Sequence, residues 1–211
     1  MTVGEQHSIS WRFYTNWFRK FEEAYGPILS RLRADDLPHC LTDLQNGDVD
    51  FVIAYAAVDE GMGDGQNLVI GKDRLVPVCK PDSAGKPIFN FEGKEIRVPF
   101  LQFGDAAPIS QHLQPMFQNH GLGPRLQTVY ENSMAGALLI RAREGSGVAW
   151  LPESLIAADL ASKTLVHTGS DAWKVVLDIR LYRNKQHSNQ LTRSIWSFLE
   201  GREALAPQSV L

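Results

Sequence analysis

Residues 44–55, with the sequence Leu-Gln-Asn-Gly-Asp-Val-Asp-Phe-Val-Ile-Ala-Tyr, carry the signals that decide the fold class of this chain. Asn46-Gly47 predicts the end of a helix, because glycine adopts the left-handed conformation in which many helices terminate. Residues 49–55 then form a nearly continuous apolar run, which is typical of a parallel strand covered on both faces. A helix followed directly by a buried parallel strand indicates an α/β fold.

The residues before this stretch show the same alternation of strand and helix. Residues 2–6 predict a first strand, and Ser8 or Ser10 is expected to cap the following helix. Gly26-Pro27 ends that helix, residues 28–33 predict a second strand, and Asp35 or Asp36 is expected to cap a second helix. The apolar residues of the two helices recur at helical spacing: Tyr14, Trp17, Phe18, Phe21 and Tyr25 in the first, Leu37, Cys40, Leu41 and Leu44 in the second.

A second α/β series follows a glycine-rich break at residues 61–66. Its expected strands are residues 68–79, 96–101, 126–130, 147–151 and 175–183, and its expected helices are residues 108–119, 133–143, a helix from Pro152, and 188–201. The two α/β series predict two lobes. The last helix needs a partner to cover its apolar face, so the chain is expected to return to the first and shorter lobe. We therefore predict lobe I from residues 1–70 plus 184–211 and lobe II from residues 71–183.

Residues 145–153, Gly-Ser-Gly-Val-Ala-Trp-Leu-Pro-Glu, link a helix end to a short strand and a new helix. The glycines let the preceding helix end tightly, and Pro152 suits the first position of the next helix. We interpret this segment as structural.

Composition excludes several classes of protein. The formal net charge of −3 gives no electrostatic case for nucleic-acid binding by this chain alone. Two cysteines, Cys40 and Cys79, do not suggest a secreted disulfide scaffold. No window of 18 uninterrupted apolar residues occurs, and the first residues do not resemble a signal peptide, so a cytoplasmic location is expected.

No motif indicates an enzyme, a metal site or a bound cofactor. His39 and Cys40 are adjacent, so on a helix they point about 100° apart, and Cys40 belongs to the apolar face. Residues 61–65 are rich in glycine but lack the pattern of a phosphate-binding loop. The six histidines are scattered along the chain. We predict a protein that is not an enzyme.

A two-lobed α/β protein binds small molecules in the crevice outside the carboxyl ends of its strands. Free N–H groups and hydroxyls at a helix start suit an anion. The candidate ligand-binding residues therefore follow strands: His7, Ser8, Ser10, Asp36, Leu37, Tyr55, Pro99, Phe100, Gln102, Asn132, Ser133 and Met134.

Several of these residues also have an ordinary structural interpretation. Ser10, Ser133 and Asp36 are equally good helix caps. Met134 could fill a gap in the core, and His7 could simply make a local hydrogen bond.

An ordered set of motifs resembles the effector-binding domain of LysR-type transcriptional regulators over essentially the whole chain. The motifs are His7-Ser8-Ile9-Ser10, the helix end at Phe21-Glu22, residues 44–51, Pro77-Val78-Cys79 and residues 145–153. The resemblance implies two Rossmann-like lobes of the type 2 periplasmic-binding-protein architecture, with an effector in the cleft between the lobes. It assigns effector contacts to Ser8, Ser10, Ser133 and the Phe100–Gln102 segment. Asp35 and Asp36 depart from the many relatives that have neutral residues there, and they either disfavour a strongly anionic effector or cap the helix.

The resemblance also implies partners and a second mechanism. Such regulators form dimers, and tetramers at full length, and contact DNA through an N-terminal winged helix-turn-helix that these residues do not include. Four segments are similar to the hypochlorite-responsive member of the family: residues 77–79, Gly85 with Phe89-Asn90, residues 132–134 and residues 149–152. That member is thought to be switched by methionine oxidation. Met134 falls on one methionine of that regulator, whereas Ile109 stands where another would be expected. Met134 and Cys79 are thus the redox candidates, with oxidation of Met134 favoured. An extracellular solute receptor of the same fold is the remaining alternative.

Overall fold

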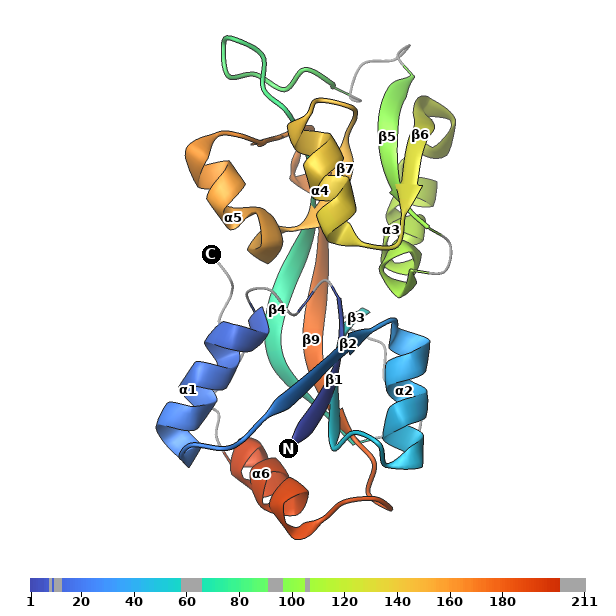
Figure 1. Cartoon of the computed structure of the whole chain (residues 1–211). Coiled ribbons are helices and arrows are strands. Elements are labelled where there is room, and N and C mark those ends of the chain that lie inside the picture. The colour runs from blue at the N-terminus through green and yellow to red at the C-terminus, as the bar shows by residue number, and fades with distance from the viewer. Residues whose placement is uncertain (8, 10–12, 58–65, 91–96, 105–106, 202–211) are drawn as a thin grey trace. The chain divides into compact units, whose positions relative to one another are not determined.

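The computed structural model describes residues 1–7, 9, 13–57, 66–90, 97–104 and 107–201, which form two compact units. Unit 1 comprises residues 1–73 and 177–211, and unit 2 comprises residues 74–176. Two long strands, β4 (Gln66–Cys79) and β9 (Val175–Arg183), carry the chain from one unit to the other (Figure 1).

The sheet of unit 1 contains strands in the order β2-β1-β3-β9. β1 (Thr2–Gln6) pairs in parallel with β2 (Arg31–Asp35) and with β3 (Phe51–Ala57), as the sequence predicts. β9 continues the sheet by pairing antiparallel with β3, with Val52 opposite Tyr182, and β4 follows on the other side of β9.

Alternation along β3 places helices on both faces of this sheet. Val52 and Ala54 point to one face, where they form a cluster with Leu37, Cys40 and Leu44 of α2 (Leu37–Asn46). Phe51 points to the other face and stacks on Trp196 of α6 (Gln190–Glu200), at 6.4 Å between ring centroids. α1 (Thr15–Tyr25) joins α6 on that face, and its expected aromatic stripe contacts Phe198 (Figure 1).

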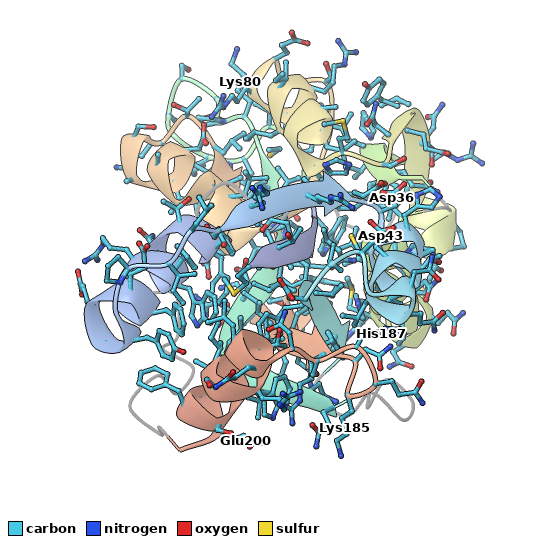
Figure 2. All side chains as sticks on the ribbon, turned by 60° about the horizontal axis from the view of Figure 1, so that its bottom comes forward. Asp36, Asp43, Lys80, Lys185, His187 and Glu200 are labelled. Carbon is cyan, nitrogen blue, oxygen red and sulfur yellow. The ribbon has the colours of Figure 1, made fainter. Side chains whose placement is uncertain are left out.

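Gly47 ends α2, as Asn46-Gly47 predicts. Its φ of 82° is left-handed, and its N–H donates to the carbonyls of Asp43 and Leu44. An added Cβ at Gly47 would also stand only 3.0 Å from Cγ of His187, which lies beyond this helix end (Figure 2). The left-handed conformation therefore requires glycine there, and a larger residue would also displace the exposed side chain of His187.

Unit 2 has a two-stranded parallel sheet, β5 (Val98–Phe103) and β6 (Leu126–Asn132), and an antiparallel group in which β4 pairs with β7 (Ala149–Pro152) and β8 (Val166–His167). Its helices are α3 (Pro108–Asn119), α4 (Ala135–Arg143) and α5 (Glu153–Ser162), with short 3-10 turns η2 (Gly123–Arg125) and η3 (Asp171–Trp173). The fully buried Trp150 anchors the core, and its indole nitrogen donates to the Trp173 carbonyl at 2.8 Å.

The segment 145–153 has the structural role that the sequence predicts. Gly145 adopts a φ of 84° directly after α4. Gly147 packs on β5, and the backbone of Val148 exchanges hydrogen bonds with Pro99 and Leu101. Pro152 differs from the expectation: it is the last residue of β7 and the N-cap of α5, which begins at Glu153.

Two further boundaries differ from those expected. β2 covers residues 31–35 rather than 28–33, because it is defined by parallel pairing with β1 and carries no buried periodicity that the sequence could reveal. Residues 177–183, expected in the second lobe, are grouped with unit 1, because β9 pairs with β3, and residues 71–73 of β4 are grouped with unit 1 as well. No helix in the described ranges is long and apolar enough to cross a membrane.

Replacing Gly147 with alanine tests the close packing of the 145–153 segment. The new Cβ would lie 2.7 Å from the carbonyl oxygen and 3.0 Å from the carbonyl carbon of Pro99, and backbone cannot move aside cheaply. We expect Gly147→Ala to lower the free energy of unfolding by about 1–3 kcal/mol, measured by urea denaturation.

Gly136→Ala is the matched control, because a Cβ on this residue of α4 meets no heavy atom of the described structure within 4 Å. It should leave the stability unchanged or raise it by up to about 1 kcal/mol. Equal effects of the two substitutions would contradict the packing described for Gly147.

Candidate functional site

Three predicted site residues of unit 1, His7, Asp36 and Leu37, lie at the carboxyl ends of β1 and β2. Gln6 pairs with Asp35 as the last residues of these parallel strands, and His7 and Asp36 follow them directly. His7 is exposed, whereas Leu37 is buried as the first residue of α2. Ser8 and Ser10 lie outside the described residues. The structure therefore brings His7 and Asp36 to one edge of the sheet.

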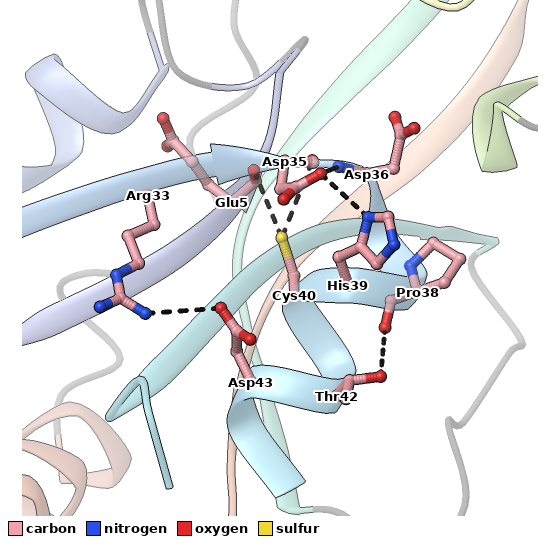
Figure 3. A network of polar contacts seen from close by, with 9 residues as sticks. All are labelled: Glu5, Arg33, Asp35, Asp36, Pro38, His39, Cys40, Thr42 and Asp43. Atoms are coloured by element: carbon pink, nitrogen blue, oxygen red, sulfur yellow. Dashed lines mark hydrogen bonds and ion pairs between the residues drawn. The ribbon is translucent and has the colours of Figure 1, made fainter. Parts of the chain in front are cut away.

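The carboxylate of Asp35 organises the start of α2 (Figure 3). It accepts hydrogen bonds from the backbone N–H of Asp36 at 2.7 Å and from Nδ1 of His39 at 3.2 Å. The backbone bond first, and then His39, lower the pKa of Asp35 below its usual range. Asp36 occupies the N-cap position, but its side chain makes no capping hydrogen bond in the described structure. Two acidic side chains thus stand at this helix start.

Cys40 is buried one turn into α2, as its apolar face predicts. Its thiol donates to the carbonyl oxygens of Glu5 at 3.6 Å and Asp35 at 3.7 Å (Figure 3). Burial is the main cause that raises its pKa to about 11. A thiol with this pKa is almost entirely protonated at neutral pH and is a poor nucleophile.

Tyr55 is not at a strand end, contrary to the prediction, because β3 continues to Ala57. It is buried, its N–H donates to the side-chain oxygen of Gln6 at 2.8 Å, and its hydroxyl donates to Asp73 at 2.9 Å. Its N–H and hydroxyl groups are therefore engaged in hydrogen bonds inside unit 1.

A buried polar network on β4 and β9 escaped the sequence analysis. Arg180 forms an ion pair with Asp178 at 2.9 Å and donates to the side chain of Asn67 at the same distance. Asp73 and Asp178 are both buried. The signal available in the sequence was an aspartate inside each apolar strand, since buried carboxylates are rare unless they are paired.

In unit 2, Asn132 is the last residue of β6, and Ser133 and Met134 lie between it and α4, which begins at Ala135 rather than at residue 133 as expected. The side-chain oxygen of Asn132 accepts from the backbone N–H of Met134 at 2.9 Å, which forms an Asx turn. Met134, rather than Ser133, is the N-cap of α4, and no side chain in the described residues caps this helix. The hydroxyl of the exposed Ser133 makes no hydrogen bond within the described part of the chain.

Pro99, Phe100 and Gln102 lie within β5 instead of following it, so this prediction was wrong by a few residues. The strand extends to Phe103 because its whole length pairs with β6. Phe100 is buried, and the side chain of Gln102 accepts a hydrogen bond from the hydroxyl of Thr128 at 2.6 Å.

Phe100 and Gln102, but not Pro99, line a pocket that belongs entirely to unit 2. It lies between α3 and the β5–β6 pair and has a volume of about 360 Å³. Phe100 and Gln102 face it from β5, Leu126 and Thr128 from β6, and Gln114 and Phe117 from α3.

The two redox candidates differ in access. Met134 has 52% of its surface exposed, whereas Cys79 is fully buried. The Cys79 thiol points at the carbonyl oxygen of Phe89, at 3.8 Å, and burial raises its pKa. Met134 is therefore accessible to an oxidant and Cys79 is not. No group of three or more metal-ligating side chains occurs among the described residues.

Comparison with known proteins places this geometry in a family. The model of the LysR substrate binding domain matches residues 1–204. The HTH-type transcriptional regulator YjiE of Escherichia coli (strain K12) is 23% identical over 172 residues, which make up 82% of this chain and 56% of that protein. The chain thus spans just over half the length of this curated relative.

Solved structures show the same fold. The apo-form regulatory domain of HypT from Salmonella typhimurium has a TM-score of 0.78 at 22% identity, over 97% of this chain and 95% of that chain. Full-length HypT, described as a hypochlorite-specific LysR-type transcriptional regulator, has a TM-score of 0.79 at 22% identity, over 96% of this chain and 67% of that chain. The sequence resemblance to the hypochlorite-responsive member is confirmed as a similarity of fold.

The family match covers every residue that the structure describes, in both α/β units. The chain therefore belongs to the LysR substrate binding domain family, the effector-binding regulatory domain of LysR-type transcriptional regulators, and has the type 2 periplasmic-binding-protein fold.

Proposed function

We propose that this chain senses a small-molecule effector for a LysR-type regulator that binds DNA. The observation that supports this most is the start of α4. Its first N–H groups lack a side-chain cap in the described structure, and the exposed Ser133 directly precedes its N-cap residue, Met134. Uncapped N–H groups at a helix start attract an anion or a hydrogen-bond acceptor. An effector carboxylate or carbonyl group would satisfy them.

The other proposed contacts have the opposite character. Asp36, like Asp35, is acidic and stands at the start of α2 beside His7. An effector that is negatively charged throughout would be repelled by these carboxylates. We therefore propose an effector with one acceptor or anionic end and one cationic or neutral end, of which an amino acid is the simplest example.

Such an effector acts by its differential affinity for two arrangements of the domain. It shifts their populations only by the difference between its two binding free energies. We propose that the shift changes the geometry of the two lobes and of a dimer, and that a segment outside these residues contacts DNA. The net charge of −3 supports DNA contact through another segment rather than through these residues. Because the regulator binds DNA, we propose a cytoplasmic location. The family match favours this role over that of an extracellular solute receptor.

Dimer formation is supported by two edge strands with exposed apolar side chains. β2 is the last strand of its sheet, all five of its residues are exposed, and Leu32 is 39% exposed. β6 pairs with β5 alone in its sheet, and its Val129 is 49% exposed. Strand edges of this kind invite pairing with another chain. We propose a homodimer, and tetramers of the full-length protein.

A second candidate function is an oxidant sensor, favoured by the exposure of Met134 at the start of α4. Oxidation converts its thioether into a polar sulfoxide. A polar group at the N-cap would change what the start of α4 can bind, so oxidation and ligand binding would act on the same segment.

The effector is tested by thermal unfolding of the chain in the presence of organic acids, amino acids and aromatic compounds. A ligand at a hundred times its dissociation constant adds about 2.7 kcal/mol of stability, which for this size raises Tm by roughly 5–11 °C. Ser133→Ala should reduce that rise and leave the unfolding free energy without ligand within about 0.5 kcal/mol.

Ser83→Ala serves as the matched control, because Ser83 is another exposed serine of unit 2 outside α4. It should retain the full rise in Tm. A true effector whose Tm shift survives in Ser133→Ala would remove Ser133 from the site.

Oxidation is tested by treating the folded chain with a small excess of hypochlorite and mapping the products by peptide mass spectrometry. Met134 should form sulfoxide well before the buried Met116, and Cys79 should remain reduced because burial protects it and raises its pKa. Met134→Leu should keep the fold and remove any response of the regulator to hypochlorite. An unchanged response would exclude Met134 from the mechanism.

The dimer is tested by sedimentation equilibrium of charged variants. Leu32→Asp and Val129→Asp place an uncompensated carboxylate on each edge strand, and each should raise the dimer dissociation constant at least about tenfold. Leu191→Asp on α6, where the leucine is 40% exposed, should leave it unchanged. A dimer that is equally stable in all three variants would exclude both edge strands from the interface.

A further inference from the structure

We propose that the pocket between α3 and the β5–β6 pair is a second ligand site, which takes an uncharged aromatic molecule bearing an amide or a similar hydrogen-bonding group. The pocket lies inside unit 2 and does not include Ser133 or Met134. The site is therefore separate from the start of α4. Two residues that the sequence analysis assigned to the effector, Phe100 and Gln102, line this pocket.

The floor of the pocket is aromatic and rigid. The rings of Phe100 and Phe117 meet edge to face, at 5.7 Å between centroids and 87° between planes. The buried Trp150 packs edge to face against both rings, at 5.7 Å and 5.0 Å. Rings fixed in this way offer a preformed surface on which a planar ligand can stack or pack edge-on.

The wall of the pocket is polar but neutral. Ser110, Gln114 and Gln118 follow one another at four-residue spacing, so they form one stripe along α3. Within the described part of the chain, their side chains make no hydrogen bond. Opposite them, the amide oxygen of Gln102 is already bonded to Thr128, so its amide nitrogen is the group left to donate. The wall can therefore both donate to and accept from a ligand amide.

The absence of charge selects against organic anions. Among the described residues that line the pocket, none has an ionisable side chain. A carboxylate entering it would lose hydration without gaining a cationic partner, and this desolvation is costly. A carboxamide of the same shape loses much less and finds matching groups in the wall.

The size of the pocket fits a bicyclic molecule. Small-molecule sites start at about 300 Å³, and a closed cavity of about 150 Å³ holds benzene. The volume of about 360 Å³ leaves room for two fused rings and a substituent. The space exists because α3 ends in a turn with Gly121, at a φ of 59°, and Gly123, neither of which has a side chain to fill it.

The test uses indole-3-carboxamide and indole-3-carboxylate as matched probes, with binding to the whole chain measured by isothermal titration calorimetry. The carboxamide should bind at least about tenfold more tightly than the carboxylate. Thr128→Trp places a large ring in the pocket and should abolish binding, whereas Gln127→Trp, whose side chain points to the opposite face of the strand, should not. Circular dichroism checks that both variants fold.

A charge change on α3 tests the selectivity. Gln114→Arg adds a cation to the wall and should narrow the affinity ratio of the two probes by roughly two- to fivefold. Gln111→Arg, the same change on an exposed glutamine of α3 that does not line the pocket, should leave the ratio unchanged. The proposal is overturned if the carboxamide does not bind, if the carboxylate binds equally well, or if the two arginine variants behave alike. Loss of this site would leave a Ser133-dependent effector unaffected, so the two proposals fail separately.

Discussion

Burial of β3 on both faces is the constraint on which unit 1 depends. Residues 51–56 of this strand are almost inaccessible to solvent, and each face requires its own helix cover. Val52 and Ala54 hold α2, and Phe51 holds α6 through Trp196. Because α2 is held in this way, its first turn is fixed at the carboxyl ends of β1 and β2. The position of Asp35 and Asp36 at this edge is thus a consequence of apolar packing on the strand beside it.

The two helix starts that we propose as effector contacts are built from different chemistry. At α2, the carboxylate of Asp35 bonds to the N–H of Asp36 and to His39, so the start is negatively charged. At α4, the side chain of Asn132 accepts from the N–H of Met134, and no side chain in the described residues caps the following N–H groups. The start of α2 therefore repels an anion, whereas the start of α4 attracts one.

The order of strands and helices could be predicted from the sequence because burial leaves a periodic apolar pattern, as in residues 49–55 and 37–44. The predicted position of β2 was wrong because Arg31–Asp35 is exposed along its whole length and lacks such a pattern. The role of Ser133 as a cap was ambiguous from residue types, and the structure gives the N-cap to Met134. Tyr55 was misplaced because β3 extends two residues further, to Ala57, and its hydroxyl partner, Asp73, lies 18 positions away in the chain. The pocket of unit 2 combines segments that no local pattern connects.

The chain order of the two units has a consequence for biosynthesis. Unit 2 is one continuous stretch, residues 74–176, inserted between two parts of unit 1. Strand β3 must therefore wait for β9, since residue 52 pairs with residue 182, and α6 arrives later still. On the ribosome, the middle of the polypeptide can close its core first, while Phe51 remains without Trp196. The nascent amino-terminal half would then be the part most exposed to chaperones and to premature aggregation.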